Sequence, residues 1–389
     1  MKLLKVSPHS APAWRCGGIV ESVWQSACSL ARAGVQVRLL TTDGDGMGGS
    51  MDLAEYAPFQ RNGNLEVTFC RRLARKSVSL AMLARLPAMV READIVELHG
   101  IYSFPVIPAL FTARVLGRPV VWSPHGMLQR WEGTRRPALK AAWELICRMA
   151  CPPRLVLRVT SEQEARESAG RMGAARIEII ANGVAIPERV ERCPRVDWLR
   201  MVFVGRLDPK KGIENLLEAC RILNSRGLTA WTLAIAGAGP AAYEAKLRGL
   251  AESVGAPGQI ELLGDIRGEA KERLFASTDL AVVPSYTENY CHVVGEALAH
   301  AVPVVASRGT PWAEIEPAGC GLWVLNDPPS LAGAIEKMST LPLREMGERG
   351  REWIAARYSW DHKAARFISL FNELIGPGGS RAEDADAKC

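Results

Sequence analysis

Residues 279–307, DLAVVPSYTENYCHVVGEALAHAVPVVAS, contain the pattern that decides the fold. The segment begins and ends with short runs that are nearly all apolar and rich in valine, and a helical stretch lies between them. Such runs are typical of strands buried on both faces of a parallel sheet that is covered by helices. The segment therefore predicts two strands joined by a helix that begins near Asn289.

The same alternation extends along the whole chain, with one interruption at IPERVERCPRVDW (186–198), a linker-like segment with two prolines. We expect an α/β protein with two doubly wound parallel-sheet domains, in residues 1–192 and 193–357. The last periodic segment, 358–376, is expected to be helical and to cross back to the first domain. The tail, 377–389, lacks large apolar side chains and is expected to be disordered.

Composition excludes several classes of protein. The chain is 48% hydrophobic and 23% charged, which is typical of globular domains. Every apolar run is interrupted well before about 18 residues, so no membrane span is expected. The N-terminus becomes polar too soon for a signal peptide. Ten scattered cysteines without a Cys-x-x-Cys pair indicate neither a zinc site nor a disulfide framework. We expect a cytoplasmic protein.

Charge is divided unevenly along the sequence. Residues 1–195 carry 27 basic and 17 acidic side chains, net +10, whereas residues 196–389 carry 21 and 25, net −4. This division argues against a uniformly nucleic-acid-binding protein. It favours a first domain that meets phosphates or an anionic membrane.

A possible membrane contact lies at RRLARKSVSLAMLARL (71–86), where five basic residues adjoin four apolar ones, Leu80, Met82, Leu83 and Leu86. An interfacial amphipathic helix has this composition. A second cluster has Arg130, Trp131, Arg135 and Arg136 before Leu139 and Trp143. The alternative is a solvated basic helix whose apolar side chains face the core.

Two carboxylates and two cations follow expected strands of the second domain. Glu288 ends one strand, and Glu296 comes eight residues later on the helix expected to begin between them. Arg206 and Lys211 follow the strand LRMVFVG (199–205). A helix N-terminus together with two cations suits a diphosphate. Solvated glutamates and a surface turn are the ordinary alternatives.

The first domain offers weaker candidates. Gly17 and Gly18 open the first long helix, where backbone N–H groups can approach a phosphate, and an ordinary strand-to-helix turn is the alternative. His125 ends the strand PVVWSPHG (119–126) and could hydrogen-bond a sugar hydroxyl. A structural histidine is the alternative, and His99 occupies a similar position.

Together these motifs resemble the retaining glycosyltransferases of family 4, which have the GT-B fold of two Rossmann-like domains facing a cleft. The resemblance extends over nearly the whole chain. Its most specific part is Glu288-x7-Glu296 followed by ALAHAVPVVAS, joined to Gly205-Arg206-x4-Lys211 upstream. The stretches SPHGMLQRW and GTPWAEIEPAGCGLWV are similar to the branch that builds bacterial exopolysaccharide, capsule and lipopolysaccharide.

The resemblance implies metal-independent, retaining hexosyl transfer from a nucleotide-diphosphate sugar to a saccharide, in surface polysaccharide synthesis. It implies a lipid-linked acceptor, peripheral contact with the anionic inner membrane, no nucleic acid and no cofactor. Catalytic roles fall to His125 and Glu288. Donor binding falls to eight residues: Gly17, Gly18, Arg206, Lys211, Asn289, Tyr290, Cys291 and Glu296.

Within that set, Arg206 and Lys211 hold the diphosphate, Glu288 contacts the donor sugar, and Glu296 contacts the ribose hydroxyls. Front-face attack, with the leaving phosphate taking the acceptor proton, is the mechanism implied. Two departures stand out. Tyr290-Cys291 replaces the usual Phe-Gly, which puts a side chain where backbone should approach the phosphate. His125 stands where many members of the branch carry Arg.

The sequence also allows other functional interpretations. Gly237 and Gly239, with Glu261 about 20 residues on, resemble a dinucleotide-binding loop, and a nicotinamide or flavin oxidoreductase is the alternative they suggest. The third glycine of that motif is replaced, however, and the loop lies mid-chain instead of after a domain's first strand. Asp43 and Asp45 resemble a metal-binding carboxylate pair in a glycine-rich loop. A GT-B nucleotide-sugar epimerase or phosphorylase is a further alternative, although no clear acid–base pair for epimerisation is found.

Overall fold

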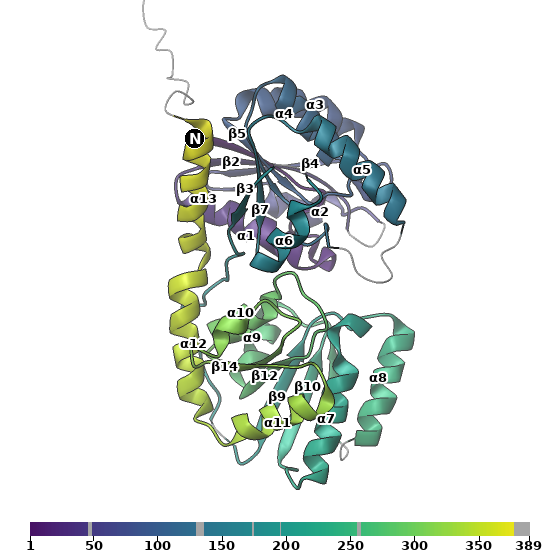
Figure 1. The fold of residues 1–389 in the computed structure, drawn as a ribbon, viewed down its shortest axis with the longest axis vertical. Coiled ribbons are helices and arrows are strands. Elements are labelled where there is room, and N and C mark those ends of the chain that lie inside the picture. The colour runs from purple at the N-terminus through teal and green to yellow at the C-terminus, as the bar shows by residue number, and fades with distance from the viewer. Residues whose placement is uncertain (46–48, 130–135, 173–174, 195, 255–257, 377–389) are drawn as a thin grey trace, which may run out of the picture. The chain divides into compact units, whose positions relative to one another are not determined.

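The computed structural model describes residues 1–45, 49–129, 136–172, 175–194, 196–254 and 258–376. The chain divides into two compact units (Figure 1). Unit 1 comprises Met1–Gly183 and Trp360–Cys389, and unit 2 comprises Val184–Ser359. The first crossing between units therefore falls nine residues before the expected position at 192/193. The expected disordered tail, 377–389, lies outside the described residues.

Unit 1 is built on an eight-stranded sheet in the order β3-β4-β2-β1-β5-β6-β7-β8, in which every pairing but β3 with β4 is parallel. Seven of its strands are runs of mostly apolar residues in the sequence, whereas the two-residue β3 has no apolar residue. Its strands are β1 (Lys2–Val6), β2 (Gln36–Thr42), β3 (Arg61–Asn62), β4 (Leu65–Cys70), β5 (Ile95–His99), β6 (Val120–Ser123), β7 (Leu155–Val159) and β8 (Arg176–Ile179).

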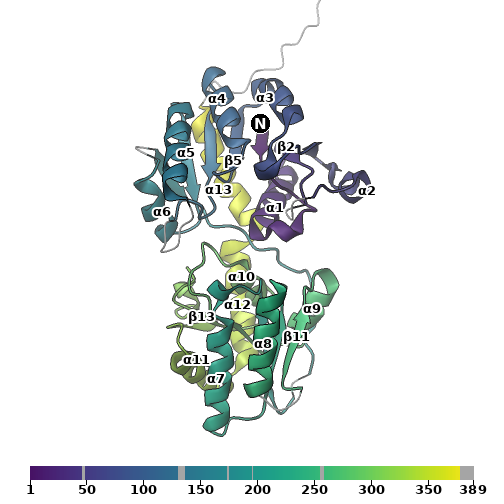
Figure 2. The same ribbon diagram turned by 90° about the vertical axis from the view of Figure 1, so that its right-hand side faces the viewer.

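Helices cover both faces of this sheet, as the apolar character of its strands predicts. The helices of unit 1 are α1 (Gly18–Arg32), α2 (Leu53–Tyr56), α3 (Leu80–Glu92), α4 (Val106–Val115), α5 (Pro137–Ala150), α6 (Glu162–Ala169) and α13 (Trp360–Ile375). Helices α3, α4 and α5 enclose one core, and α1 and α13 enclose the other (Figures 1 and 2). Phe367 and Phe371 of α13 are buried in the core that α13 shares with α1.

Unit 2 repeats the plan with a six-stranded parallel sheet in the order β11-β10-β9-β12-β13-β14. Its strands are β9 (Leu199–Val204), β10 (Trp231–Ala236), β11 (Ile260–Gly264), β12 (Leu280–Val283), β13 (Val304–Ser307) and β14 (Gly321–Val324). Its helices are α7 (Ile213–Ser225), α8 (Ala241–Val254), α9 (Gly268–Ala276), α10 (His292–Ala299), α11 (Pro328–Ser339) and α12 (Leu343–Tyr358). Two doubly wound parallel sheets are the GT-B architecture, so the predicted fold class is confirmed.

Two local predictions need correction. Helix α10 begins at His292 instead of Asn289, because Cys291 adopts a left-handed conformation with φ 64°. Glu288, predicted to end a strand, lies in the loop between β12, which ends at Val283, and α10. The segment 71–86 is not one helix either. A short turn with positive φ at Lys76 and Ser77 precedes α3, whose first residue is Leu80.

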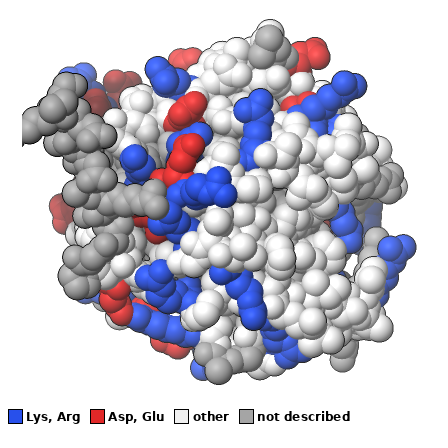
Figure 3. Space-filling view, turned by 90° about the horizontal axis from the view of Figure 1, so that it is seen from above, with Lys and Arg blue, Asp and Glu red and all other residues white. Residues whose placement is uncertain are grey.

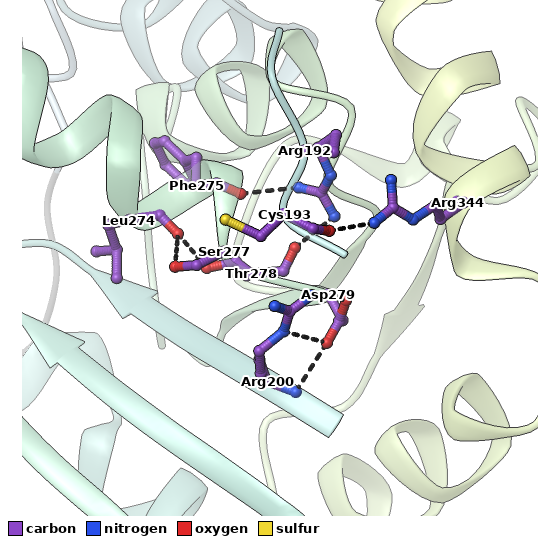
Figure 4. A network of polar contacts seen from close by, with 9 residues as sticks. All are labelled: Arg192, Cys193, Arg200, Leu274, Phe275, Ser277, Thr278, Asp279 and Arg344. Atoms are coloured by element: carbon purple, nitrogen blue, oxygen red, sulfur yellow. Dashed lines mark hydrogen bonds and ion pairs between the residues drawn. The ribbon is translucent and has the colours of Figure 1, made fainter. Parts of the chain in front are cut away.

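The linker after Gly183 contacts unit 2 at Arg192 and Cys193 (Figure 4). The guanidinium of Arg192 donates to the carbonyl oxygens of Phe275 at 2.8 Å and Thr278 at 2.5 Å, at the end of α9. Cys193 N–H donates to Ala276 O at 2.9 Å. These contacts satisfy carbonyl groups that are left without partners at a helix end. The linker therefore belongs to unit 2, and the boundary between the units lies upstream of residue 193.

Among the described residues, no helix has the length and apolar content needed to cross a bilayer.

Candidate functional site

The sequence-predicted site residues fall on both units. Gly17, Gly18 and His125 lie in unit 1, and the other seven lie in unit 2. In each unit they occupy loops that follow the carboxyl ends of parallel strands, or the first two turns of the helices that come after those loops, where ligands bind in sheets of this kind.

In unit 2, the loop after β9 positions Lys211. The carboxylate of Asp208 accepts the N–H of Lys210 at 3.0 Å and closes a turn. Gly212 follows at φ 63°, and a Cβ atom there would lie 2.1 Å from the carbonyl oxygen of Pro284. Only glycine permits this approach, because any side chain would collide with backbone. The loop after β9 thus touches the loop after β12, which carries Glu288.

Lys211 and Glu288 meet at this contact. Their side chains form an ion pair between Nζ and Oε1, and the same carboxylate oxygen accepts the Ser285 hydroxyl at 2.7 Å. The N–H of Glu288 donates to the Gly309 carbonyl at 2.8 Å, which fixes its backbone. The side chains are 20% and 13% exposed, so both charges are oriented yet reachable from solvent.

Arg206 lies in the same loop but outside this pair. Its side chain is exposed and makes no ion pair with any described residue. An exposed guanidinium that makes no ion pair can bind a phosphate through two parallel N–H groups. The site in unit 2 therefore combines one engaged cation, one available cation and one carboxylate.

The turn at Tyr290 and Cys291 leads into α10. Trp312 Nε1 donates to the carbonyl oxygens of both residues, at 2.5 and 3.2 Å. These bonds hold Cys291 in a left-handed conformation that costs a non-glycine residue about 1–2 kcal/mol. Cys291 is 7% exposed, and burial raises the pKa of its thiol well above the ordinary value. The cysteine thus packs inward and puts no side chain on the surface of the turn. Asn289, just before it, is half-buried.

Glu296 lies on the second turn of α10 and is paired with a residue that the sequence analysis did not identify. Lys271 Nζ on α9 lies 2.7 Å from its Oε2. Burial alone would raise the pKa of Glu296, but Lys271, with smaller contributions from His292 and His300, outweighs burial and holds that pKa below its ordinary value. The carboxylate is therefore ionised at neutral pH and is an acceptor for hydroxyl groups.

The loop with Gly237 and Gly239 has a packing role. A Cβ atom on Gly237 would lie 1.7 Å from the Gly205 carbonyl oxygen, and one on Gly239 would lie 2.2 Å from that of Leu207. Both glycines let the loop after β10 press against the loop after β9. Strand β10 is also the second strand of its unit, whereas a dinucleotide fingerprint follows the first. Close packing thus accounts for the glycine spacing.

In unit 1, Gly17 precedes α1 at φ 81° and ψ −160°, a conformation essentially restricted to glycine. No atom lies within 4 Å of the position of a Cβ atom there. Gly18, the first residue of α1, is exposed. The start of this 15-residue helix therefore presents backbone N–H groups at an open position that suits an anion.

His125 follows β6 in a left-handed conformation with φ 54°. The next N–H, of Gly126, donates to Glu164 Oε1 at 2.5 Å, and Thr160 donates to Oε2 of the same buried carboxylate. The ring of His125 stacks on that of His99, with His125 Nε2 3.0 Å from His99 Nδ1. Backbone and ring are therefore both held in place.

Behind the two histidines lies a buried pair that the sequence analysis missed. Lys5 Nζ lies 2.7 Å from Glu97 Oε2 and donates to Ser26 Oγ at 2.9 Å. Lys5 and Glu97 are register partners on β1 and β5 and are at most 1% exposed. Lys5 and Glu97 each stand between apolar residues of a strand, and this pattern could have identified the pair from the sequence, because a buried charge requires a partner.

Asp43 and Asp45 hold their own loop. The carboxylate of Asp43 accepts the N–H of Arg72 at 2.7 Å, and that of Asp45 accepts the N–H of Gly49 at 2.9 Å. Residues 46–48 lie outside the described part of the chain. Across the described residues, no group of three or more histidine, cysteine or carboxylate side chains is arranged to hold a metal ion.

Comparison with known proteins gives a consistent match to both halves. The model described as Glycosyltransferase Family 4 matches residues 16–186, and that described as Glycosyl transferases group 1 matches residues 195–353. The GDP-mannose-dependent alpha-(1-6)-phosphatidylinositol dimannoside mannosyltransferase of Mycobacterium tuberculosis is 31% identical over 68% of this chain and 72% of its own length.

Two further similarities cover most of the chain. The GDP-mannose:cellobiosyl-diphosphopolyprenol alpha-mannosyltransferase of Xanthomonas campestris is 26% identical over 74% of this chain and 76% of its own. The solved structure of Anabaena Alr3699/HepE in complex with UDP superposes with a TM-score of 0.74 at 16% identity, covering 95% of this chain and 99% of that one. At that identity the superposition establishes a shared fold.

Proposed function

Because this chain belongs to the family 4 glycosyltransferases, with the GT-B fold, we propose that it transfers a hexose from a nucleotide-diphosphate sugar to a lipid-linked saccharide in surface polysaccharide synthesis. The observation that carries the donor assignment is the ion pair of Lys211 with Glu288 beside the available guanidinium of Arg206. Cations at the carboxyl edge of a sheet stabilise a diphosphate whose charge grows as it departs. The UDP complex of the Anabaena protein supports a nucleotide in this fold.

The reaction we propose retains anomeric configuration. The bond between the sugar C1 and the diphosphate oxygen breaks while the acceptor oxygen bonds to C1 on the same face. The acceptor proton passes to the leaving phosphate oxygen, so no side-chain base is required. Arg206 and Lys211 stabilise the departing diphosphate, Glu288 faces the sugar near C1, and the ionised Glu296 accepts the ribose hydroxyls. Asn289, Tyr290 and Cys291 form the turn that leads into the donor-side helix.

Unit 1 supplies the remaining contacts in this proposal. The helix start at Gly17 and Gly18 meets the distal phosphate through backbone N–H groups. His125 lines the sugar site. We propose that no metal ion and no further cofactor take part, because side chains and helix N-termini neutralise the diphosphate. Turnover should survive EDTA, and strict dependence on manganese or magnesium would contradict this part of the proposal.

The acceptor assignment rests on the names of two relatives, which specify a phosphatidylinositol dimannoside and a diphosphopolyprenol. Lipid acceptors require access to a membrane surface. We propose that the outer face of α3, α4 and α5 provides it on the cytoplasmic side of the inner membrane. Exposed apolar side chains gather on these packed helices: Leu80, Leu83, Phe111, Val115, Leu139, Leu145, Ile146 and Met149. Basic side chains, together with some acidic ones, are spread among uncharged side chains on the face seen in Figure 3.

This face differs from the one that the sequence predicted. Met82 and Leu86 are buried in the core, so only Leu80 and Leu83 of the four apolar residues predicted in segment 71–86 are exposed. Leu139 of the second predicted cluster is exposed as well. Arg130, Trp131 and Arg135 lie outside the described residues. The exposed set instead extends over three helices, which a search for one amphipathic segment does not detect.

Vesicle sedimentation tests the membrane contact. Anionic vesicles should bind the protein at low salt and release it at high salt, because each basic residue near the surface contributes about 1 kcal/mol. Phe111 is 59% exposed, and Phe111→Glu should weaken binding by about tenfold or more, given the roughly 1.5–3 kcal/mol of burying a phenylalanine. Leu325→Glu, at a residue that is 54% exposed in unit 2, is the matched control. Equal binding to neutral vesicles would contradict electrostatic docking.

The reaction itself is tested with one accepted donor and acceptor. The anomeric signal of the new glycosidic bond, compared by NMR with that of the donor sugar, reports whether configuration is retained. Retention supports the front-face mechanism, whereas an inverted product would refute it.

A further inference from the structure

Helices α9 and α10 meet at two contacts that lie one helical turn apart. Phe275 of α9 is 0% exposed, and its ring stacks on that of His300 with centroids 4.9 Å apart. Four residues earlier on both segments, Lys271 Nζ lies 2.7 Å from Glu296 Oε2. Residues four apart lie on the same face of a helix, so both contacts belong to one interface. Because α9 and α10 begin after the carboxyl ends of β11 and β12, the Lys271–Glu296 contact is the nearer of the two to the ligand-binding edge of the sheet.

The two contacts differ in burial. The Phe275 ring is enclosed, and His300 Nδ1 donates to the Glu296 carbonyl at 2.7 Å, so this contact packs the helices together. The side chains of Lys271 and Glu296, by contrast, are 27% and 28% exposed. An ion pair in such a position adds little to stability. A charged pair at the ligand-binding edge that contributes little to stability is suited to meet a ligand.

The Glu296 carboxylate has acceptor capacity that the protein does not use. Lys271 engages Oε2, whereas Oε1 accepts no hydrogen bond from a described residue and is not enclosed by the protein. Burial raises the pKa of Glu296, but the charge and hydrogen bond of Lys271 outweigh burial, so the carboxylate is ionised at neutral pH. Both carboxylate oxygens can accept, and an ammonium has more N–H groups than one acceptor takes. The pair can therefore bind two adjacent hydroxyl groups at once.

We propose that Lys271 is a specificity-determining residue, which together with Glu296 selects donors whose nucleotide carries ribose over donors built on 2′-deoxyribose. The inference rests on the proposed function, in which Glu296 accepts the ribose hydroxyls. The donor is then a ribonucleoside diphosphate sugar, with uracil, guanine or adenine as the base. A thymidine diphosphate sugar, whose nucleotide lacks the 2′ hydroxyl, is a poor donor.

Lys271 gives the site a selectivity that a lone carboxylate would not have. A hydroxyl beside Oε2 donates its proton to the carboxylate and accepts from Lys271 Nζ, so it makes two charge-assisted hydrogen bonds. The neighbouring hydroxyl donates to Oε1. A deoxyribose puts a C–H group in one of these positions, and a partly buried charged group is left without its partner. The loss should weaken binding by about 10- to 100-fold, the range for hydrogen bonds to charged groups.

Calorimetric titration of the whole protein compares each ribonucleoside diphosphate, UDP, GDP and ADP, with its 2′-deoxy and 3′-deoxy analogues. For the base that binds, we expect the 2′-deoxy analogue to bind about 10- to 100-fold more weakly than the ribonucleotide. Lys271→Met keeps the length of the side chain and removes its donors. This variant should lose about tenfold in affinity for the ribonucleotide, but less than about threefold for the analogue that lacks the hydroxyl beside Nζ.

Arg226→Met is the matched control, because it breaks the ion pair of Arg226 with Glu336 on α11, at 2.9 Å, and should leave every affinity unchanged. Equal binding of the ribonucleotide and its 2′-deoxy analogue to the wild type would overturn the inference and leave the donor site standing. A uniform loss for all ligands in Lys271→Met would show that Lys271 only joins α9 to α10, which also overturns it.

If Lys271→Met fails to fold, Lys271→Ala takes its place in the same comparison, and the wild-type affinities still decide whether ribose is selected. If no nucleoside diphosphate binds the wild type, the proposed function fails at the donor site and the inference fails with it. This result differs from equal binding of the two sugars, so the two failures are distinguishable.

Discussion

Replacing Glu288 by glutamine should separate binding from catalysis at the donor site. In the free protein the Glu288 carboxylate engages the ammonium of Lys211, so it competes with a diphosphate for that cation and repels its charge. Glutamine keeps the size and removes both effects. With side chains 13% and 20% exposed, the competing interaction is worth about 1 kcal/mol, so nucleoside diphosphate affinity should rise roughly fivefold.

Turnover should change in the opposite direction. If Glu288 stabilises charge near the reacting carbon, glutamine should lower kcat by roughly 10²–10³. Calorimetric titration with UDP and GDP gives the affinity, and nucleotide release from the accepted donor gives kcat. Glu336→Gln is a matched control, because Glu336 on α11 pairs with Arg226 at 2.9 Å beyond the far end of α7, and its replacement should leave both quantities unchanged. A parallel loss of affinity and turnover in Glu288→Gln would show that this residue only shapes the loop.

Two further outcomes follow from the charges of unit 2. Arg206→Ala should lower kcat by roughly 10²–10³. The free energy of unfolding should change by less than about 0.5 kcal/mol, because the side chain is exposed and makes no ion pair with a described residue. A larger loss of stability in urea denaturation would contradict this. Burial alone would raise the pKa of Asp279, but the hydrogen bonds and charge of Arg200 hold it below 3.8. Asp279→Asn should therefore lose about 2–4 kcal/mol at pH 7. That deficit should shrink as pH falls below the ordinary aspartate range and through the lowered folded-state pKa, and a deficit that grows in this direction would refute the assignment.

The sheets were predictable because their strands are buried on both faces. Runs such as LAVV (280–283) must be apolar throughout when helices cover both sides of a parallel sheet, so composition alone identifies them. The start of α10 was not predictable in the same way. It depends on Trp312, 20 residues downstream of His292, holding the carbonyls of Tyr290 and Cys291. No local pattern reports such a contact.

The site shows the same contrast. Spacing along the chain indicated Lys211 and Glu288, but their ion pair depends on the close approach of Gly212 to Pro284. The partner of Glu296 was missed because Lys271 lies on a different helix and nothing in its own segment distinguishes it from a surface lysine. The buried Lys5 carried a readable signal, a charge inside an apolar strand, whose partner only the sheet register identifies.

The most direct test of the central claim is nucleotide release from a panel of UDP-, GDP-, ADP- and TDP-sugars. The wild type and the Arg206→Ala and Lys211→Ala proteins are assayed together, with Lys246→Ala as a control outside the site. We expect the wild type to release the nucleoside diphosphate from at least one donor. We also expect each site variant to lose roughly 10²-fold or more of that rate while the control retains it. Wild-type rates in both site variants would contradict the assignment of the donor diphosphate to this loop of unit 2.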